Sequence, residues 1–197
     1  MHQYPYFGKG NLKLSSEIIT FSLPSHKTCP GKGLCAKYCY SLKRERSFPN
    51  ILKSRYANLE ATRKKTFIKK SVSLLTKRKE SIIRIHPDGD FYDQKYLDKW
   101  KEIAVQLPHK TFYCYTKSFM LDFSDLPSNM KVIQSFGSYD DSKIDISKNT
   151  ARVIEDKSEL KKGELLCQYS HKHKIKCGKD CSYCIKSPIV HVAFIRH

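Results

Sequence analysis

The stretch SIIRIHPDGDFYDQKYLDKWKEIAVQLPHKTFYCYTKS, residues 81–118, contains the pattern that decides the fold. Residues 81–86 are a β-branched run that stops at PDGD, which predicts a buried strand leading into a turn. Residues 91–108 follow a helical period, because apolar residues recur there at three- and four-residue spacing. These residues are Tyr96, Leu97, Trp100, Ile103 and Ala104. Residues 110–118 form a second strand-like run, so the stretch predicts a strand–helix–strand unit with two parallel strands.

Strand-like and helical runs continue on both sides of this unit. Further strands are predicted at residues 17–24, 130–138, 151–155 and 188–197, and a helix at residues 50–79. We therefore expect an α/β fold with five or six strands, a mostly parallel sheet and crossover helices, similar to part of a TIM barrel. Residues 1–160 would form this core, and the cysteine-rich residues 161–197, with the final strand, would pack on the same domain. Parallel strands end along one rim, where such folds place their chemistry.

Seven of the eight cysteines fall into two groups. The first cysteine group has the spacing C-x5-C-x3-C and consists of Cys29, Cys35 and Cys39. The second cysteine group has the spacing C-x9-C-x3-C-x2-C and consists of Cys167, Cys177, Cys181 and Cys184. Clustered cysteines in a reducing compartment bind metal more often than they form disulfides. Cys114 stands alone in an apolar strand, where a small buried core residue is expected.

Each group predicts a metal centre. Four thiolates close a zinc site or hold an iron–sulfur cluster. Three thiolates leave one position open, as in a 4Fe–4S cluster with one free iron, whereas His26 as a fourth ligand would complete a zinc site. Gly31 and Gly33 would let the backbone approach the metal closely. His171 and His173 lie between the cysteines of the second group, either as alternative ligands or as part of a solvated loop.

Polar residues that follow two predicted strands are expected on the same rim. His86, Asp88 and Asp90 follow the first strand of the opening stretch, and Lys117 and Ser118 follow the second. Acids at such a position often bind a ligand or transfer protons, so Asp88 and Asp90 are candidate catalytic residues. Lys117 and Ser118 are placed to contact a phosphate or carboxylate group. The plainer alternatives are a turn that caps the following helix and a solvated surface loop.

The chain is strongly basic, with 37 Lys and Arg against 19 Asp and Glu and a formal net charge of +18. Residues 41–80 contain thirteen Lys and Arg and three Glu. Such a surface attracts polyanions, so nucleic acid is a predicted partner, with a solvated lysine-rich helix as the alternative. No apolar run approaches the roughly 20 residues of a membrane helix, and the first residues have no secretory signal pattern, so we expect a cytoplasmic protein without a membrane partner.

Four segments resemble, in their order, the phage gene-product-eighty-eight family. They are FSLPSHKTCPGKGLCAKYCY, RIHPDGDFYDQKYLDKW, FYCYTKS and the second cysteine group with VHVAFIRH. This resemblance spans most of the chain and implies a bacteriophage protein located in the host cell cytoplasm. The first cysteine group is also distantly similar to that of the radical S-adenosylmethionine (SAM) enzymes, where three cysteines spaced CxxxCxxC hold a 4Fe–4S cluster whose open iron binds SAM.

The radical SAM resemblance implies roles for several residues. The first cysteine group would bind the cluster, and the second would hold an auxiliary cluster. Gly89 and Asp90, in DGDF, stand where those enzymes have a GGE motif and would bind SAM. Lys117 is also a predicted cofactor-binding residue, because of its place after the second strand and not because of the resemblance. Three functions stay open: a radical-SAM-like enzyme that acts on or binds nucleic acid, a zinc- or cluster-stabilised nucleic-acid-binding module without catalysis, and an iron–sulfur protein for redox or electron transfer.

Overall fold

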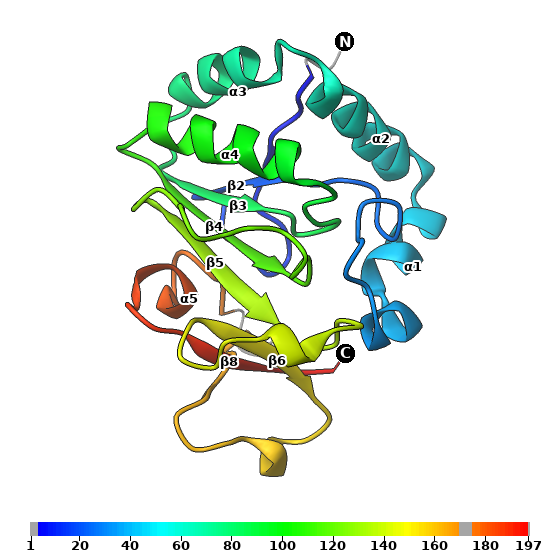
Figure 1. Cartoon of the computed structure of the whole chain (residues 1–197), viewed down its shortest axis with the longest axis vertical. Helices are drawn as coiled ribbons and strands as arrows, with labels where there is room; N and C mark the ends of the chain where they lie inside the picture. Colours follow the sequence, from blue (N-terminus) through cyan, green and yellow to red (C-terminus); the bar gives the residue numbers. More distant parts are fainter. Residues whose placement is uncertain (1–3, 170–174, 197) are drawn as a thin grey trace.

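The computed structural model of the chain describes residues 4–169 and 175–196. Its centre is an eight-stranded sheet with the spatial order β1-β2-β3-β4-β5-β6-β8-β7 (Figure 1). Neighbouring strands are parallel except for β1 and β2, which are antiparallel. The predicted α/β fold with a mostly parallel sheet is therefore confirmed. The strands are β1 (Gly8–Lys9), β2 (Ile18–Phe21), β3 (Ile82–Ile85), β4 (Thr111–Thr116), β5 (Met130–Ser135), β6 (Thr150–Ile154), β7 (Leu165–Leu166) and β8 (His191–Ile195).

Six strands correspond to the predicted ones, and their β-branched and aromatic residues suit a sheet with both faces covered. The predicted number of five or six strands was too low, because β1 and β7 also belong to the sheet. Each has two residues, which is too short to show a strand pattern in the sequence. From β1 to β6 the strands lie side by side in chain order.

The helices are α1 (Tyr40–Ser47), α2 (Pro49–Arg63), α3 (Phe67–Thr76), α4 (Gln94–Gln106) and α5 (Tyr183–Lys186). The prediction of α4 is confirmed, and its start is fixed by Asp93, whose carboxylate accepts a hydrogen bond from Tyr96 N at 2.7 Å. The prediction of one helix over residues 50–79 was wrong, because the backbone turns to an extended conformation at Lys64 and separates α2 from α3. Within the described residues, no helix is long and apolar enough to cross a membrane.

One face of the sheet packs against α2, α3 and α4 over an aromatic core (Figure 1). The ring of Trp100 lies 5.2 Å from that of Phe21 on β2 and 5.9 Å from that of Phe67 on α3, measured between centroids. Cys114 is fully buried in the same core, as predicted. The rim and the other face of the sheet are therefore the places left for chemistry.

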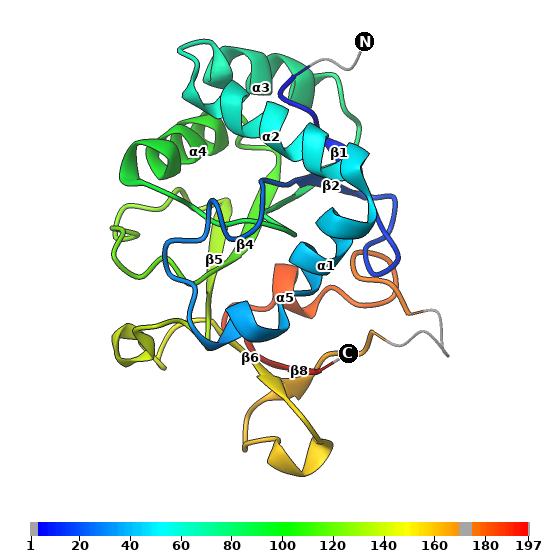
Figure 2. The same ribbon diagram turned by 90° about the vertical axis from the view of Figure 1, so that its right-hand side faces the viewer.

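The opposite face is covered by the segment that joins β7 to β8 (Figure 2). We call its described parts, residues 167–169 and 175–190, the strap. The strap reaches the connection between β1 and β2, where Ser15 N donates to the carbonyl oxygen of Cys177 and Cys177 N donates to that of Lys13, both at 2.9 Å. It then returns through α5, whose Ile185 carbonyl accepts a hydrogen bond from Lys131 Nζ at 3.1 Å. Because the strap ends in β8, residues 161–197 contribute strands to the same sheet as the core.

Candidate metal centre

Four loops meet at the carboxyl end of the sheet, which we call the rim. They follow β2, β3, β4 and β5 and consist of residues 22–39, 86–90, 117–118 and 136–141. Lys117 N donates to Asp90 Oδ2 at 2.8 Å, and Ser138 Oγ donates to the carbonyl oxygen of Gly31 at 2.8 Å. The predicted convergence of the first cysteine loop, HPDGDF and YTKS is therefore confirmed, and the loop after β5 joins them.

Gly31 and Gly33 allow the first cysteine loop to lie directly on its neighbours. A side-chain carbon at position 31 would lie 1.8 Å from the carbonyl oxygen of Lys117, and one at position 33 would lie 2.3 Å from the carbonyl carbon of Ser138. Neither position can hold a larger residue without displacing the backbone. Because both positions lack a side chain, the backbone of the loop can lie in direct contact with the residues that follow β4 and β5.

The three cysteines of the first group are neighbours on this loop. Cys35 lies in a short 3-10 helix (Leu34–Tyr38), and Cys39 directly precedes α1. All three thiols are free and partly exposed. The pKa of Cys29 is raised to about 12, first by burial, then by the charge of Asp90, and further by Cys35 and Cys39. A thiolate at position 29 is therefore unfavourable unless a cation lies beside it.

Asp90 and Lys117 lie next to these thiols. Asp90 is buried and accepts hydrogen bonds from Thr116 Oγ1 at 2.7 Å, and from Phe91 N and Lys117 N at 2.8 Å. Burial raises the pKa of the Asp90 carboxyl, against the effect of these donors. Burial lowers the pKa of Lys117, against the opposing charges of Cys35, Asp90 and Asp141. The rim thus holds a carboxyl and an amine, both partly deprived of water, beside three thiols.

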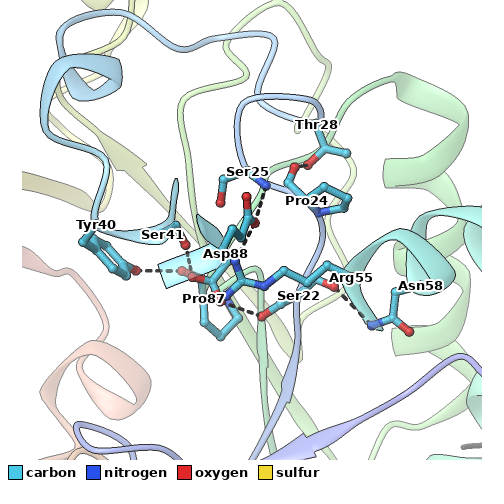
Figure 3. Close-up of polar contacts among 11 residues, drawn as sticks. Ser22, Pro24, Ser25, Thr28, Tyr40, Ser41, Arg55, Asn58, Pro87 and Asp88 are labelled. Atoms are coloured by element: carbon cyan, nitrogen blue, oxygen red, sulfur yellow. Dashed lines mark hydrogen bonds and ion pairs between the residues drawn. The ribbon is translucent and has the colours of Figure 1, made fainter. Parts of the chain in front are cut away.

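Asp88 has other partners (Figure 3). Its carboxylate forms an ion pair with Arg55 of α2 and accepts hydrogen bonds from the hydroxyl groups of Ser22, at 3.1 Å, and Ser41. Arg55 also pairs with Glu45 of α1. The catalytic role predicted for Asp88 stays a prediction, since its contacts are those of a residue that positions its neighbours.

The cluster of Glu45, Arg55 and Asp88 ties the first cysteine loop to two helices. Glu45 accepts a hydrogen bond from Ser25 N at 2.8 Å, within the loop. All three charged side chains are at most 4 % exposed, so the pairs are not screened by solvent. The sequence pattern did not reveal this cluster, because Glu45 and Arg55 read as ordinary members of a charged helical surface. Their distance from Asp88 in the chain leaves no local signal.

The turn between β3 and α4 depends on two unusual backbone positions. Gly89 has a φ of +83°, and a side-chain carbon there would lie 2.7 Å from both Leu23 Cβ and Thr28 Oγ1. His86 has a φ of +55° and its Nε2 lies 2.8 Å from the hydroxyl group of Tyr96. Burial lowers the pKa of His86 to about 3, so the ring is neutral near pH 7. The turn therefore presses against the start of the cysteine loop.

The second cysteine group belongs to the strap and packs against the sheet. Cys177 packs with Ile18 and Tyr113, whereas Cys167 and Cys184 pack with a separate apolar cluster around Ile133. The pKa of Cys177 is raised to about 11, first by burial and further by the charges of Cys167 and Cys184. Cys181 contributes to the raised pKa of Cys184 in the same way, after burial. The four thiols are therefore electrostatic neighbours.

Neither group is arranged around one ion. Among residues 4–169 and 175–196, no three His, Cys, Asp or Glu side chains are grouped so as to hold a metal ion. His171 and His173 lie outside the described residues. His26, the alternative fourth ligand, has a φ of +59° and a buried Nε2 without a hydrogen-bond partner in the described structure. Metal binding by both cysteine groups therefore stays a prediction.

Ser118 and Lys117, the two residues predicted to contact a phosphate or carboxylate group, have different surroundings. Ser118 is fully buried, and its hydroxyl donates to the carbonyl oxygen of Phe91 at 2.7 Å, so it stabilises the rim rather than facing a ligand. Lys117 Nζ donates to Ser135 Oγ at 2.5 Å. The sequence reading overlooked Arg84, although a charged residue inside the apolar run SIIRIH was a visible signal.

The comparisons with known proteins agree with one of the two resemblances. A family described as gene product 88 matches residues 5–192. No curated protein and no solved structure shows significant similarity to the chain. The likeness to radical SAM enzymes thus stays a prediction. Because the match covers nearly all 197 residues, the chain belongs to the gene product 88 family.

Proposed function

We propose that this chain is an iron–sulfur protein whose first cysteine group holds a 4Fe–4S cluster at the rim. The observation that supports this most is that Cys29 lies near the buried carboxyl of Asp90 and near Cys35 and Cys39, where the loops after four parallel strands meet. The loop that bears the thiols is held by backbone contacts at Gly31 and Gly33. Three protein ligands would leave one iron of the cluster open to a further ligand.

The donor set suits a cluster better than a single ion. Thiolates are soft ligands that select zinc or iron–sulfur clusters. Binding of a metal removes the proton from a thiol, which offsets the unfavourable ionisation of Cys29. A cubane holds its ligands apart by a cage of iron and sulfide, so neighbouring thiols that do not converge on one point are compatible with it. A zinc site completed by His26 is the alternative, since its buried Nε2 has no partner within the described structure.

The residues beside the thiols suit a radical-SAM-like enzyme. With SAM bound, a reduced 4Fe–4S cluster supplies one electron for cleavage of a carbon–sulfur bond, as the resemblance implies. Asp90 has no ion pair within the described residues, so its carboxylate is available to an amino group. Lys117 provides a cation for a carboxylate group, and Gly89 holds the turn that positions Asp90. These residues would thus bind the two charged groups of an amino acid moiety.

The second cysteine group would hold a separate metal centre under the strap. The thiols of the second group affect one another's pKa values. The thiols of the first group instead lie near Asp90 and Lys117. Two clusters without a substrate site would make electron transfer the alternative function. The difference between the two functions is whether the first centre binds SAM.

Electron paramagnetic resonance of the dithionite-reduced protein, isolated without oxygen, tests the enzyme. We expect a 4Fe–4S signal that changes its g values when SAM is added, because SAM would bind the open iron. The Asp90→Asn variant should keep the signal and show a smaller change with SAM. A signal that SAM leaves unchanged would favour electron transfer, and a colourless protein that contains zinc would replace the cluster by a zinc site.

Nucleic-acid binding is a second candidate function, favoured by the exposed surface of α1, α2, α3 and the residues that follow. Of the three Glu in residues 41–80, only Glu60 is exposed, whereas Glu45 and Glu80 are buried and paired. The exposed basic residues are Lys43, Arg46, Lys53, Arg63, Lys64, Lys65, Lys69, Lys70, Lys77 and Lys79. This surface is therefore almost purely cationic and suits a phosphate backbone.

A further inference from the structure

Arg84 lies in the middle of the sheet face that the strap covers. Its neighbours Ile83 and Ile85 face the helix-side core, and alternation along β3 turns Arg84 to the other face. The guanidinium group lies over the ring of Tyr115, 4.9 Å from its centroid, and 5.9 Å from the ring centroid of Tyr113. An arginine thus lies in register between Thr20 of β2 and Tyr113 of β4.

Two buried donors at this place have no acceptor. Arg84 Nε and the hydroxyl group of Tyr113 are both buried and lack a hydrogen-bond partner in the described structure. Arg84 also forms no ion pair there, unlike Arg55 and Arg152, which pair with Glu45 and Glu164. Buried donors are almost always satisfied, so two adjacent exceptions indicate a missing acceptor.

We propose that Arg84 and Tyr113 form a binding site for the carboxylate or phosphate group of a small anionic ligand between the strap and the sheet. A guanidinium fork binds such groups through two parallel hydrogen bonds, and the Tyr113 hydroxyl adds a third donor. The guanidinium group also makes a cation–π contact with the ring of Tyr115, which helps to fix its position. Arg84 as a whole residue is partly exposed, although its Nε is buried. This inference goes beyond the proposed function, because the anion binds independently of the metal centres.

The competing role for Arg84 is to neutralise the second cysteine group. Cys177 and Cys184 are within electrostatic reach of the guanidinium, and thiolates bound to metal would carry negative charge. In that role Arg84 would support metal binding and would not bind a ligand. Metal content and anion affinity must therefore be measured on the same preparation.

Isothermal titration calorimetry at constant ionic strength, with inorganic phosphate in one series and malonate in another, tests the proposal. We expect the protein, isolated without oxygen, to bind at least one of these anions, and the tighter of the two identifies the ligand group. Arg84→Gln should weaken binding by about tenfold or more, the loss expected for a charged hydrogen bond. Arg84→Lys should also bind more weakly, because it keeps the charge and loses the fork.

Two further variants serve as controls. Tyr113→Phe should bind the anion several-fold more weakly but unfold at a similar temperature without it, since within the described residues its buried hydroxyl lacks a hydrogen-bond partner and has the Arg84 side chain as its main polar neighbour. Arg152→Gln, which breaks a bidentate pair with Glu164, should keep the affinity. The proposal is overturned if neither anion binds, or if Arg84→Gln binds equally well. Loss of metal from Arg84→Gln with unchanged anion affinity would assign Arg84 to the second cysteine group instead. If Arg84→Gln does not fold, Tyr113→Phe decides alone.

Discussion

Asp88 and Asp90 are two positions apart, yet they meet different surroundings. Asp88 points to Arg55 and is neutralised by it, whereas Asp90 accepts hydrogen bonds from uncharged donors beside the thiols. Burial raises the pKa of the Asp90 carboxyl against the charge of Lys117, and Asp90 forms no ion pair within the described residues. Of the two acids that the sequence singled out, Asp90 is thus the one suited to chemistry.

The different surroundings of Cys35, on the rim, and Cys114, in the core, give a prediction about metal content. Cys35→Ala should remove the metal of the first centre, because that centre has only three protein ligands. Cys114→Ala should retain full metal content, because Cys114 is fully buried on the helix side of the sheet. Iron, acid-labile sulfide and zinc analysis of both variants checks this. Equal metal loss from both would show that the cysteines are grouped wrongly.

Gly31 allows a sharper test of the loop. The Gly31→Ala side chain would meet the carbonyl oxygen of Lys117 at 1.8 Å, so the loop must move away from β4. We expect the free energy of unfolding to fall by about 2–3 kcal/mol, in the range of overpacked sites, together with loss of metal from the first centre. Chemical denaturation and metal analysis measure the two effects.

Gly163→Ala is the matched control for that variant. Its φ is +86° and no atom lies within 4 Å of the added carbon, so it introduces backbone strain without crowding. It should be destabilised and keep its metal. If Gly31→Ala kept both the stability and the metal of the wild type, the loop would not rest on β4 as described.

His86 predicts a dependence of stability on pH. The folded protein takes up a proton at His86 only near pH 3, whereas the unfolded chain takes it up near 6.5. This contribution to stability is therefore complete above pH 6.5 and is lost as the pH falls toward 3. At pH 5 the loss is about 2 kcal/mol, from about 1.4 kcal/mol per pH unit.

The His86→Asn variant should lack this part of the acid sensitivity. Asparagine tolerates the positive φ at position 86, so the turn is retained. Urea unfolding at pH 7.5 and at pH 5 should show the wild type losing about 2 kcal/mol more than the variant. The same loss in both proteins would mean that His86 is already protonated in the folded state or is accessible to water.

At the scale of elements, the helices α2 and α3 predict how nucleic acid would bind. Affinity for a DNA oligonucleotide, measured by fluorescence anisotropy, should fall steeply with salt as phosphate contacts release counterions. Replacing Lys69 and Lys70 of α3 by glutamine should reduce the slope of log K against log salt by about one unit per lost contact.

Lys143→Gln with Lys148→Gln is the control for charge alone. These lysines are exposed as well, but each already pairs with an aspartate three residues earlier, at 3.1 and 3.4 Å. This double variant should keep the salt slope of the wild type. Affinity that does not depend on salt would exclude binding through this surface.

The break between α2 and α3 is a helix boundary that the sequence pattern did not predict. Apolar residues recur at three- and four-residue spacing both before and after residues 62–66, which is why one long helix was predicted. The structure turns the chain at Lys64 because Leu59 of α2 and Phe67 of α3 must both reach the same core. Packing against the core therefore determines this boundary, and residues 62–66 contain no glycine or proline that would indicate it in the sequence.

At the scale of the whole molecule, the two cysteine groups lie on different parts of the fold, because the strap carries the second group. The first lies on the rim above β4 and β5, and the second lies on the strap face of the sheet (Figure 2). The strap can cross this face because the helices occupy the other one. The two proposed metal centres would therefore have different surroundings, and Arg84 lies on the same face of the sheet as the second cysteine group.

The sequence by itself determined the α/β class, six of the strands, α4 and the meeting of loops at the rim. These follow from local periodicity and from the rule that parallel strands end on one side of a sheet. The three-dimensional contacts that pair Asp88 with Arg55, place Gly31 on Lys117, and leave Arg84 Nε and the Tyr113 hydroxyl without a hydrogen-bond partner in the described part of the chain could not be predicted from the sequence. Such contacts join residues far apart in the chain, and their energies depend on burial, which no local pattern of residues contains.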